Sequence, residues 1–275
     1  MHIHRLILTA CLLFAGNLTA WAGSFEQDFA VVYIDKDTEA KYGALPINRS
    51  VLAKGMDAIA AAGAKGLVIK FFVDQPKDEQ DDKRLANSLS RIPVVLQARL
   101  DDSERTPNPL AVKFTLGSDL YGTPAATSGW IPLPRFADHV QDIGFVDFHS
   151  NVVPMVERYQ SHAVKSLVLC AIELAAGKKA QISDKKQIQV GSRIIPVDDQ
   201  NRVTVQLITP QFNKGIAFNA VLDGTAKLAL QNKIVVLAYD GPHIPTVSTP
   251  LGPLGAHKYF VNILRSLYDA APDRR

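Results

Sequence analysis

The sequence has 275 residues, with 30 lysines and arginines against 27 aspartates and glutamates, and a formal net charge of +3 at pH 7. This near balance, without a Lys/Arg cluster longer than two residues, argues against a nucleic-acid-binding protein. A chain of this length can bury a large core, in one large domain or two closely joined ones, without needing disulfide bonds.

The first 22 residues are predicted to be an export leader. Residues 1–5 are basic, the segment Leu6–Ala20 is mostly apolar and uncharged, and small residues at Ala20 and Ala22 suit a leader peptidase. The apolar run of about 15 residues is shorter than the roughly 20 that a membrane-spanning helix needs. We therefore expect cleavage after Ala22 and a periplasmic or secreted protein, with no transmembrane helix in the mature chain.

Two other interpretations of the leader remain open. Residues 8–11 resemble a lipoprotein cleavage box at Cys11, although the apolar run continues beyond this cysteine. An uncleaved leader would instead serve as an N-terminal membrane anchor. If the leader is removed, Cys170 is the remaining cysteine, and its apolar surroundings predict a buried side chain rather than a reactive thiol.

The chain after the leader alternates between apolar strands and helices. The strands are rich in β-branched residues, and the helices carry apolar residues at helical spacing. Asn48 or Ser50 is expected to cap the first helix, and Gly63 to end it. Strands that are apolar on both faces favour a parallel sheet with right-handed crossovers. The expected order is strand 28–35, helix 51–62, strand 66–73, helix 83–90 and strand 92–98.

The stretch 101–135 lacks periodicity and is rich in Pro, Gly, Ser and Thr. We expect a long surface excursion there, with room for a short hairpin. It carries Trp130, the only tryptophan after the leader. Long loops of this kind are often functional.

The rest of the chain predicts further strands and helices. Strand 144–148 is expected to pair with an antiparallel neighbour at 153–159 through a turn at 149–151, and Gly191-Ser192 is expected to turn a hairpin. The fold class is therefore α/β, a largely parallel central sheet flanked by helices with an antiparallel hairpin insertion, in a single domain over residues 23–275. The remaining elements are helix 163–176, strands 188–190, 193–197 and 203–208, helical turn 218–222, strand 233–239 and helix 257–268.

Polar residues at the strand ends are the first candidates for a binding site. Ligands of parallel α/β sheets bind outside the carboxyl ends of the strands. The alternative is that these acids cap helices or satisfy loop amides. The candidates are Asp35, Lys70, Asp74 and Asp240.

The loop 241–255 is the second candidate. Its prolines and glycines fix a backbone path that suits a ligand-framing loop, although prolines also stiffen ordinary connections. His243 and Thr249 are its candidate ligand-binding residues. His243 could also sense periplasmic acidity, because a histidine titrates near pH 6.5.

Catalytic and metal motifs are not found in the sequence. The histidines after the leader do not pair at spacings typical of metal sites, and His139, His162 and His257 are expected at the surface or at helix ends. Nucleophile-elbow, zinc-protease, Walker and dinucleotide-binding motifs are missing. We expect no catalytic residues, no metal ligands and no cofactor.

Several segments resemble, in order, the type 2 CHASE domain, an extracellular sensory module of cyclases, histidine kinases and other receptors. The resemblance runs from about Asp28 to about Tyr268, and it implies a sensory role. It rests on Val31–Asp35, Pro46–Ser50 with Ala62–Lys65, Ile143–Asp147, Gly191–Asp198, Phe218–Gly224, and Asn232–Leu237 with Thr249–Pro253.

The sequence departs from this family pattern at several positions. If the family's ligand site uses those positions, this protein binds a different ligand or no small molecule. Lys70 stands where the family usually has an acidic residue, and Ala238 where a turn usually begins with glycine. An acidic residue before Thr249–Gly252 is missing, and His257–Tyr259 differs from the usual pattern. Receptors of this family have membrane helices and an output domain after the module, whereas this sequence ends at Arg275, so a stand-alone exported protein is expected.

The leading hypothesis is an exported, non-enzymatic sensory domain. Its partners would be a small molecule, a membrane-anchored signalling protein, or both. A scaffold that has lost ligand binding is the alternative, and an exported hydrolase is less favoured. An open cleft between the strand ends and the loop 241–255 would favour the sensor, and a filled one the scaffold.

Overall fold

The computed structural model describes residues 23–117, 123–147, 151–183, 186–208 and 215–270. The predicted leader and its alternatives, Cys11 and the cleavage position Ala22, therefore lie outside the described residues. So do His149 and Ser150 of the predicted turn.

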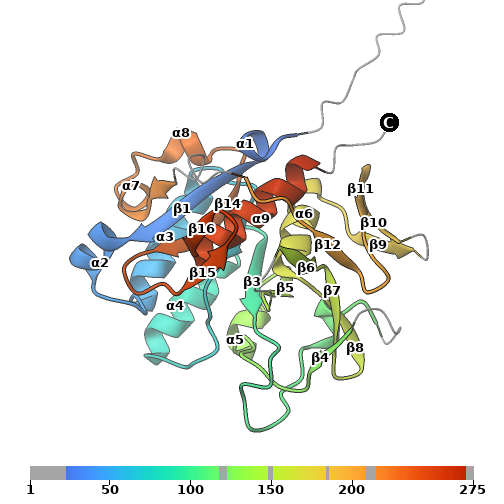
Figure 1. Cartoon of the computed structure of the whole chain (residues 1–275). Coiled ribbons are helices and arrows are strands. Elements are labelled where there is room, and N and C mark those ends of the chain that lie inside the picture. Colours follow the sequence, from blue (N-terminus) through green and yellow to red (C-terminus); the bar gives the residue numbers. More distant parts are fainter. Residues whose placement is uncertain (1–22, 118–122, 148–150, 184–185, 209–214, 271–275) are drawn as a thin grey trace, which may run out of the picture.

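A six-stranded parallel sheet forms the centre of the molecule (Figure 1). Apart from the partly buried edge strand at residues 216–217, its strands are buried on both faces, which explains their continuous apolar sequences. The predicted α/β fold with a largely parallel sheet is confirmed. In spatial order the strands are β13 (Ile216–Ala217), β1 (Phe29–Asp35), β14 (Ile234–Asp240), β2 (Gly66–Ile69), β3 (Val94–Ala98) and β5 (Asp142–Phe145).

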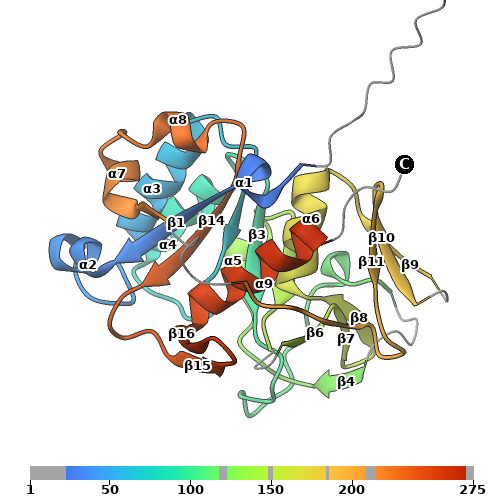
Figure 2. The same cartoon turned by 45° about the horizontal axis from the view of Figure 1, so that its top comes forward.

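Helices cover both faces of the sheet (Figure 2). Alternate strand residues belong to two separate cores, as in β14, where Val235 and Val236 point to opposite faces. One core packs under α3 (Arg49–Ala61), α4 (Glu79–Leu89), α5 (Pro134–Ala137) and α7 (Phe218–Leu222). The other packs under α6 (Leu167–Ala176) and α9 (Ala256–Ala270).

The helix ends follow local sequence signals. The side chain of Asn48 accepts a hydrogen bond from the N–H of Ser50 and caps α3, as predicted. Ser166 caps α6 by accepting from the N–H of Leu169, and Gly177 ends this helix in the left-handed conformation. The short helices are α1 (Phe25–Asp28), α2 (Lys36–Tyr42), α8 (Lys227–Leu230) and the 3-10 turn η1 (Val112–Phe114).

The predicted pairing of strand 144–148 with 153–159 is wrong. Residues 152–159 form β6 (Val152–Pro154) and β7 (Val156–Tyr159), which join other small sheets. The start of α6 lies against β5 instead, so close that a Cβ on Gly144 would meet the Cα of Leu167 at 2.5 Å. The predicted start of α6 at residue 163 is wrong too, because β8 (His162–Lys165) pairs with β7 before the helix begins.

Four smaller features complete the described part of the fold. β9 (Ala180–Ser183), β10 (Gln187–Val190) and β11 (Arg193–Pro196) form the predicted antiparallel insertion, turned at Gly191. The described part of the stretch 101–135 contains η1 and β4 (Thr123–Ala126), which pairs with β7 rather than forming its own hairpin. β6 pairs with β12 (Arg202–Thr204), and β15 (Thr246–Thr249) with β16 (Gly252–Gly255).

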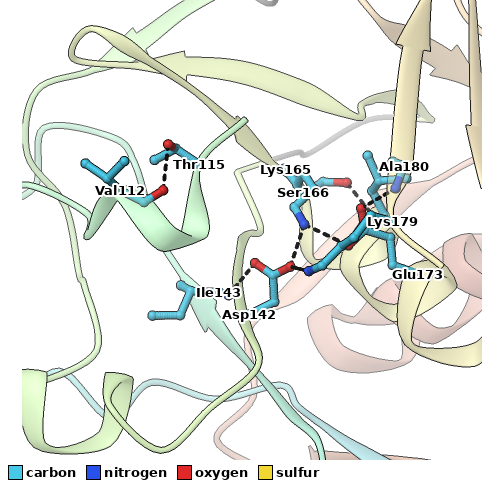
Figure 3. A network of polar contacts seen from close by, with 10 residues as sticks. Val112, Thr115, Asp142, Ile143, Lys165, Ser166, Glu173, Lys179 and Ala180 are labelled. Atoms are coloured by element: carbon cyan, nitrogen blue, oxygen red, sulfur yellow. Dashed lines mark hydrogen bonds and ion pairs between the residues drawn. The ribbon is translucent and has the colours of Figure 1, made fainter. Parts of the chain in front are cut away.

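A buried ion network holds α6 to the edge of the sheet (Figure 3). The Nζ of Lys165 donates to Asp142 on β5 at 2.5 Å and to Glu173 on α6 at 2.7 Å. Lys179 donates to Asp142 from the solvent side at 2.7 Å, and Glu173 also accepts from the N–H of Ala180. The network therefore joins β5, β8, α6 and the start of β9.

Candidate functional site

A cleft of about 680 Å³ opens at the carboxyl edge of the parallel sheet. It lies beyond the ends of β14, β2 and β3 and beside the start of α3, which is where ligands of parallel α/β sheets bind. Its lining residues are Tyr42, Ala44, Leu45, Pro46, Ile47, Asn48, Arg49, Leu52, Phe71, Phe72, Asp74, Gln75, Lys77, Asp78, Asp81, Gln97, Tyr239 and His257.

Aromatic rings form the walls of the cleft. Phe71 follows β2, and its ring centroid lies 5.3 Å from that of Tyr239 on β14. Phe72 packs against Trp130 with nearly perpendicular ring planes and ring centroids 4.8 Å apart, so the tryptophan of the predicted excursion supports one wall of the cleft without lining it. These walls suit the apolar body of a small molecule.

The polar end of the cleft is formed by Gln97 and His257. Gln97 is a buried residue of β3, and its Oε1 accepts a hydrogen bond from Lys70 Nζ at 2.9 Å. His257 lies at the start of α9, and its Nδ1 accepts from the N–H of Tyr239 at 2.9 Å. Burial, and then the nearby charge of Lys70, hold the pKa of His257 well below its usual value. The neutral ring therefore carries its proton on Nε2.

Lys70 stands behind Gln97 in an unusual setting. Its residue is 7% exposed, and its Nζ lies 5.4 Å from the ring centroid of Phe260 on α9. Burial lowers the pKa of Lys70 to about 7, although the charge of Asp147 opposes this shift. The Lys70 ammonium is therefore held by the neutral amide of Gln97 and the ring of Phe260, and the carboxylate of Asp147 acts on it only from a longer distance.

Two carboxyl groups beyond Lys70 also titrate near neutrality. Burial raises the pKa of Asp147 to about 6, although its Oδ2 accepts from the N–H of Leu100 and Arg99 lies 3.8 Å away. Burial, and then the charge of Asp147, raise the pKa of Glu157 to about 7. Of the two acids, Asp147 is the one whose charge acts on Lys70.

The rim of the cleft is mostly acidic. Asp74, Asp78 and Asp81 line it together with Lys77. Arg49 also lines the cleft, but its guanidinium is used by the protein. It pairs with buried Asp82 at 2.8 Å and donates to the carbonyl of Gln75 at 2.6 Å.

The sequence matches the model of one protein family, described as CHASE2 domain, over residues 7–275. The chain belongs to the CHASE2 domain family. No curated protein and no solved structure matches it. CHASE2 domains are extracellular sensory domains, so the predicted sensory role is supported at the level of the family.

The six predicted binding residues of this CHASE2 domain do not form one site. Asp74 lines the cleft, and Lys70 lies behind its polar end. Asp35 and Asp240 are neighbours on β1 and β14, but neither lines the cleft. Asp35 caps α2 by accepting from the N–H and hydroxyl of Thr38, and Asp240 pairs with Lys258 at 2.8 Å.

The other two predicted residues lie in the loop 241–255, which does not line the cleft. His243 is exposed, ahead of the hairpin of β15 and β16. The Thr249 hydroxyl donates to the carbonyl of Gly252 and accepts from the N–H of Leu251, which stabilises the turn.

The sequence interpretation missed Gln97, Tyr239 and the aromatic pair after β2. Gln97 carried a usable signal, because it is the one polar side chain in the predicted apolar strand 92–98. His257 was expected at the surface or at a helix end. It lies at the start of α9, and it lines the cleft with its Nδ1 accepting from the N–H of Tyr239 on β14.

Two negative findings concern the described residues of this CHASE2 domain. Within them, no group of three or more His, Cys, Asp or Glu side chains is placed to hold a metal ion. Within the same ranges, no helix has the length and apolar character needed to cross a membrane.

Proposed function

We propose that this chain is an exported, non-enzymatic sensory domain that binds a small organic molecule in the cleft at the carboxyl edge of the sheet. The observation that carries the proposal is the open cleft of about 680 Å³, which has the size and aromatic walls of a small-molecule site. The cleft lies at the strand ends beside α3 and not against the loop 241–255, but its open volume still supports a sensor over a scaffold that has lost ligand binding.

Helix α9 offers a route from the cleft to the opposite end of the domain. It begins beside His257 at the cleft and ends where the described chain begins (Figure 2). There the hydroxyl of Tyr268 donates to Asp28 at 2.6 Å, and Asp269 accepts from the N–H of Phe25 at 2.7 Å. A ligand that moves His257 would shift α9 against this junction, and contact there with a membrane-anchored signalling protein would pass the change on.

Export is part of the proposal. The leader over residues 1–22 would be cleaved after Ala22, leaving a periplasmic or secreted protein that begins at Gly23. The N-terminal sequence of the protein purified from its producing cell tests this. A start at Met1 in the membrane fraction would favour the uncleaved anchor.

The binding proposal is tested by thermal unfolding in the presence of a metabolite library that balances acids, amines and neutral compounds. Compounds that bind the folded state raise Tm. Ala44 is exposed and lines the cleft, whereas Ala40 is exposed on α2 outside it. Hits should raise Tm in the wild type and in Ala40→Trp, but not in Ala44→Trp. If no compound of any charge class raises Tm, the sensor proposal fails and the scaffold takes its place.

A further inference from the structure

The polar end of the cleft presents hydrogen-bond donors to a ligand. The Oε1 of Gln97 is already taken by Lys70, so Gln97 has its amide NH₂ group left to offer. The Nδ1 of His257 is taken by the N–H of Tyr239, so the ring offers Nε2–H. Among the residues that the structure describes, neither donor has an acceptor. Neither nitrogen is among the buried side-chain atoms without a partner, so both donors face the open cleft, where a ligand acceptor can take the place of water.

A positive charge stands directly behind these donors. Lys70 Nζ contacts Gln97, and its charge also acts on His257. The other groups that face Lys70 are the ring of Phe260 on α9 and Asp147 after β5, with Arg99 and Glu157 beyond Asp147. Within the described ranges, no carboxylate lies within ion-pair distance of Lys70 Nζ.

We propose that the cleft binds an organic carboxylate, whose acid group accepts hydrogen bonds from the Gln97 amide and His257 Nε2–H beside the charge of Lys70. The apolar body of the ligand lies against Phe71, Phe72 and Tyr239. This inference rests on the proposed function, because it names the class of molecule that the cleft takes.

The rim sets the orientation of the ligand. Asp74, Asp78 and Asp81 repel an anion at the mouth of the cleft, so the carboxylate points inward to Gln97 and His257. Two other cations line the cleft. The guanidinium of Arg49 is held by Asp82 and the carbonyl of Gln75, so Lys77 on the exposed rim is the competing cation. Lys70→Met and Lys77→Met are therefore a matched pair that separates the two possible anchors.

Binding of a carboxylate has a proton signature. A nearby anion favours the charged form of a lysine, so the ligand raises the pKa of Lys70 from about 7. At pH 8 Lys70 is mostly neutral, and binding therefore takes up a proton, approaching about one per ligand. His257 cannot take this proton at Nδ1, which accepts from Tyr239.

The experiment is isothermal titration calorimetry at pH 8 with phenylacetate, phenylacetamide and phenethylamine, each in two buffers of different ionisation enthalpy. Phenylacetate should bind most tightly and take up protons from the buffer. Lys70→Met should weaken phenylacetate by roughly ten-fold or more and abolish proton uptake, as expected for loss of a charged partner. Phenylacetamide should bind Lys70→Met and the wild type alike.

Two further variants keep the result decisive. Gln97→Glu preserves the size of the side chain but places a carboxylate against the ligand, so phenylacetate binding should be lost while the fold, measured by Tm, is kept. Lys77→Met should retain proton uptake. The proposal is overturned if the amine or the amide binds as tightly as the acid, or if Lys77→Met rather than Lys70→Met loses the acid. Failure of all three probes together with the whole library would instead overturn the sensor proposal itself.

Discussion

Two of the lysines that the structure describes are almost fully buried, and their surroundings differ completely. Lys165 is 3% exposed and makes close ion pairs with Asp142 and Glu173 (Figure 3). Lys70 is 7% exposed, and it donates its hydrogen bond to the neutral amide of Gln97. Burial alone would lower the pKa of both. At Lys165 the neighbouring Cys170, Asp142 and Glu173 together outweigh burial and raise the pKa, whereas the pKa of Lys70 falls to about 7.

The difference separates a structural charge from one available to a ligand. The network around Lys165 satisfies its charges internally and has no need of another partner. Lys70 lies next to the cleft with its charge incompletely compensated. Groups with a strongly shifted pKa at a cleft are candidates for function. Lys165, which is similarly buried but fully paired, is the comparison for Lys70.

The largest effect is expected from breaking the paired lysine. Lys165→Met leaves Asp142 and Glu173 buried with Lys179 as their remaining cation, and should lower the free energy of unfolding by about 3–5 kcal/mol. Urea denaturation at pH 7 measures this. Lys186→Met, which removes an exposed pair with Asp199, is the control and should leave stability unchanged. An equal loss in both variants would contradict a structural role for the network.

Lys70→Met should change how the free energy of unfolding depends on pH. The pKa of Lys70 is about 7 in the folded state and close to the ordinary lysine value of 10.5 when unfolded, so between these values the unfolded chain binds the additional proton. Stability of the wild type relative to Lys70→Met should therefore rise with pH, by up to about 1.4 kcal/mol per unit between pH 8 and pH 10.

Denaturation of both proteins across this range measures the difference, in which the titrating tyrosines cancel. Lys165→Met is the contrasting variant. Because the pKa of Lys165 is raised in the folded state, its contribution to stability is fully present below the unfolded pKa and is lost only at higher pH. A flat difference for Lys70→Met would show that Lys70 is charged at pH 9.

Much of the fold could be predicted from the sequence, because its signals are local. Apolar runs such as residues 233–239 become central strands, and caps such as Asn48 and Gly177 set helix ends. The pairing of residues 152–159 could not be predicted from the sequence, because it depends on which segment packs beside β5. The start of α6 takes that place against Gly144, and sequence spacing carries no record of it.

The site was predictable as an edge of the sheet but not as a set of residues. The strand-end rule led to Lys70 and Asp74, which lie at the cleft. It gave equal weight to Asp35 and Asp240, whose carboxylates serve a helix cap and an ion pair. Whether a strand-end acid is free for a ligand depends on neighbours from other elements, such as Lys258 on α9.

Gln97→Glu should give Lys70 a carboxylate partner, as Lys165 already has. A carboxylate in place of the amide would lie about as close to Lys70 Nζ as Gln97 Oε1 does, at 2.9 Å. The resulting pair should raise the pKa of Lys70 and flatten the pH dependence of stability between pH 8 and pH 10. The measurement is the same denaturation series, with Gln97→Leu as the control that removes the acceptor without adding charge. A slope that persists in Gln97→Glu would mean that the new carboxylate is protonated or turned away.

The smallest effect is expected from Asp147, the acid that acts on Lys70 from beyond contact distance. Its charge raises the pKa of Lys70 against the effect of burial, so Asp147→Asn should lower that pKa further. The stability difference between Asp147→Asn and the double variant with Lys70→Met should then begin to rise at a lower pH than it does in the wild-type background. The amide oxygen introduced by Asp147→Asn can still accept from the N–H of Leu100, which limits any loss of packing. Asp138→Asn, at an exposed acid paired with Lys113, should leave the curve in place. If Asp147→Asn moves it no further than Asp138→Asn does, burial alone sets the charge of Lys70, and the neighbouring acid has no part in tuning the cleft.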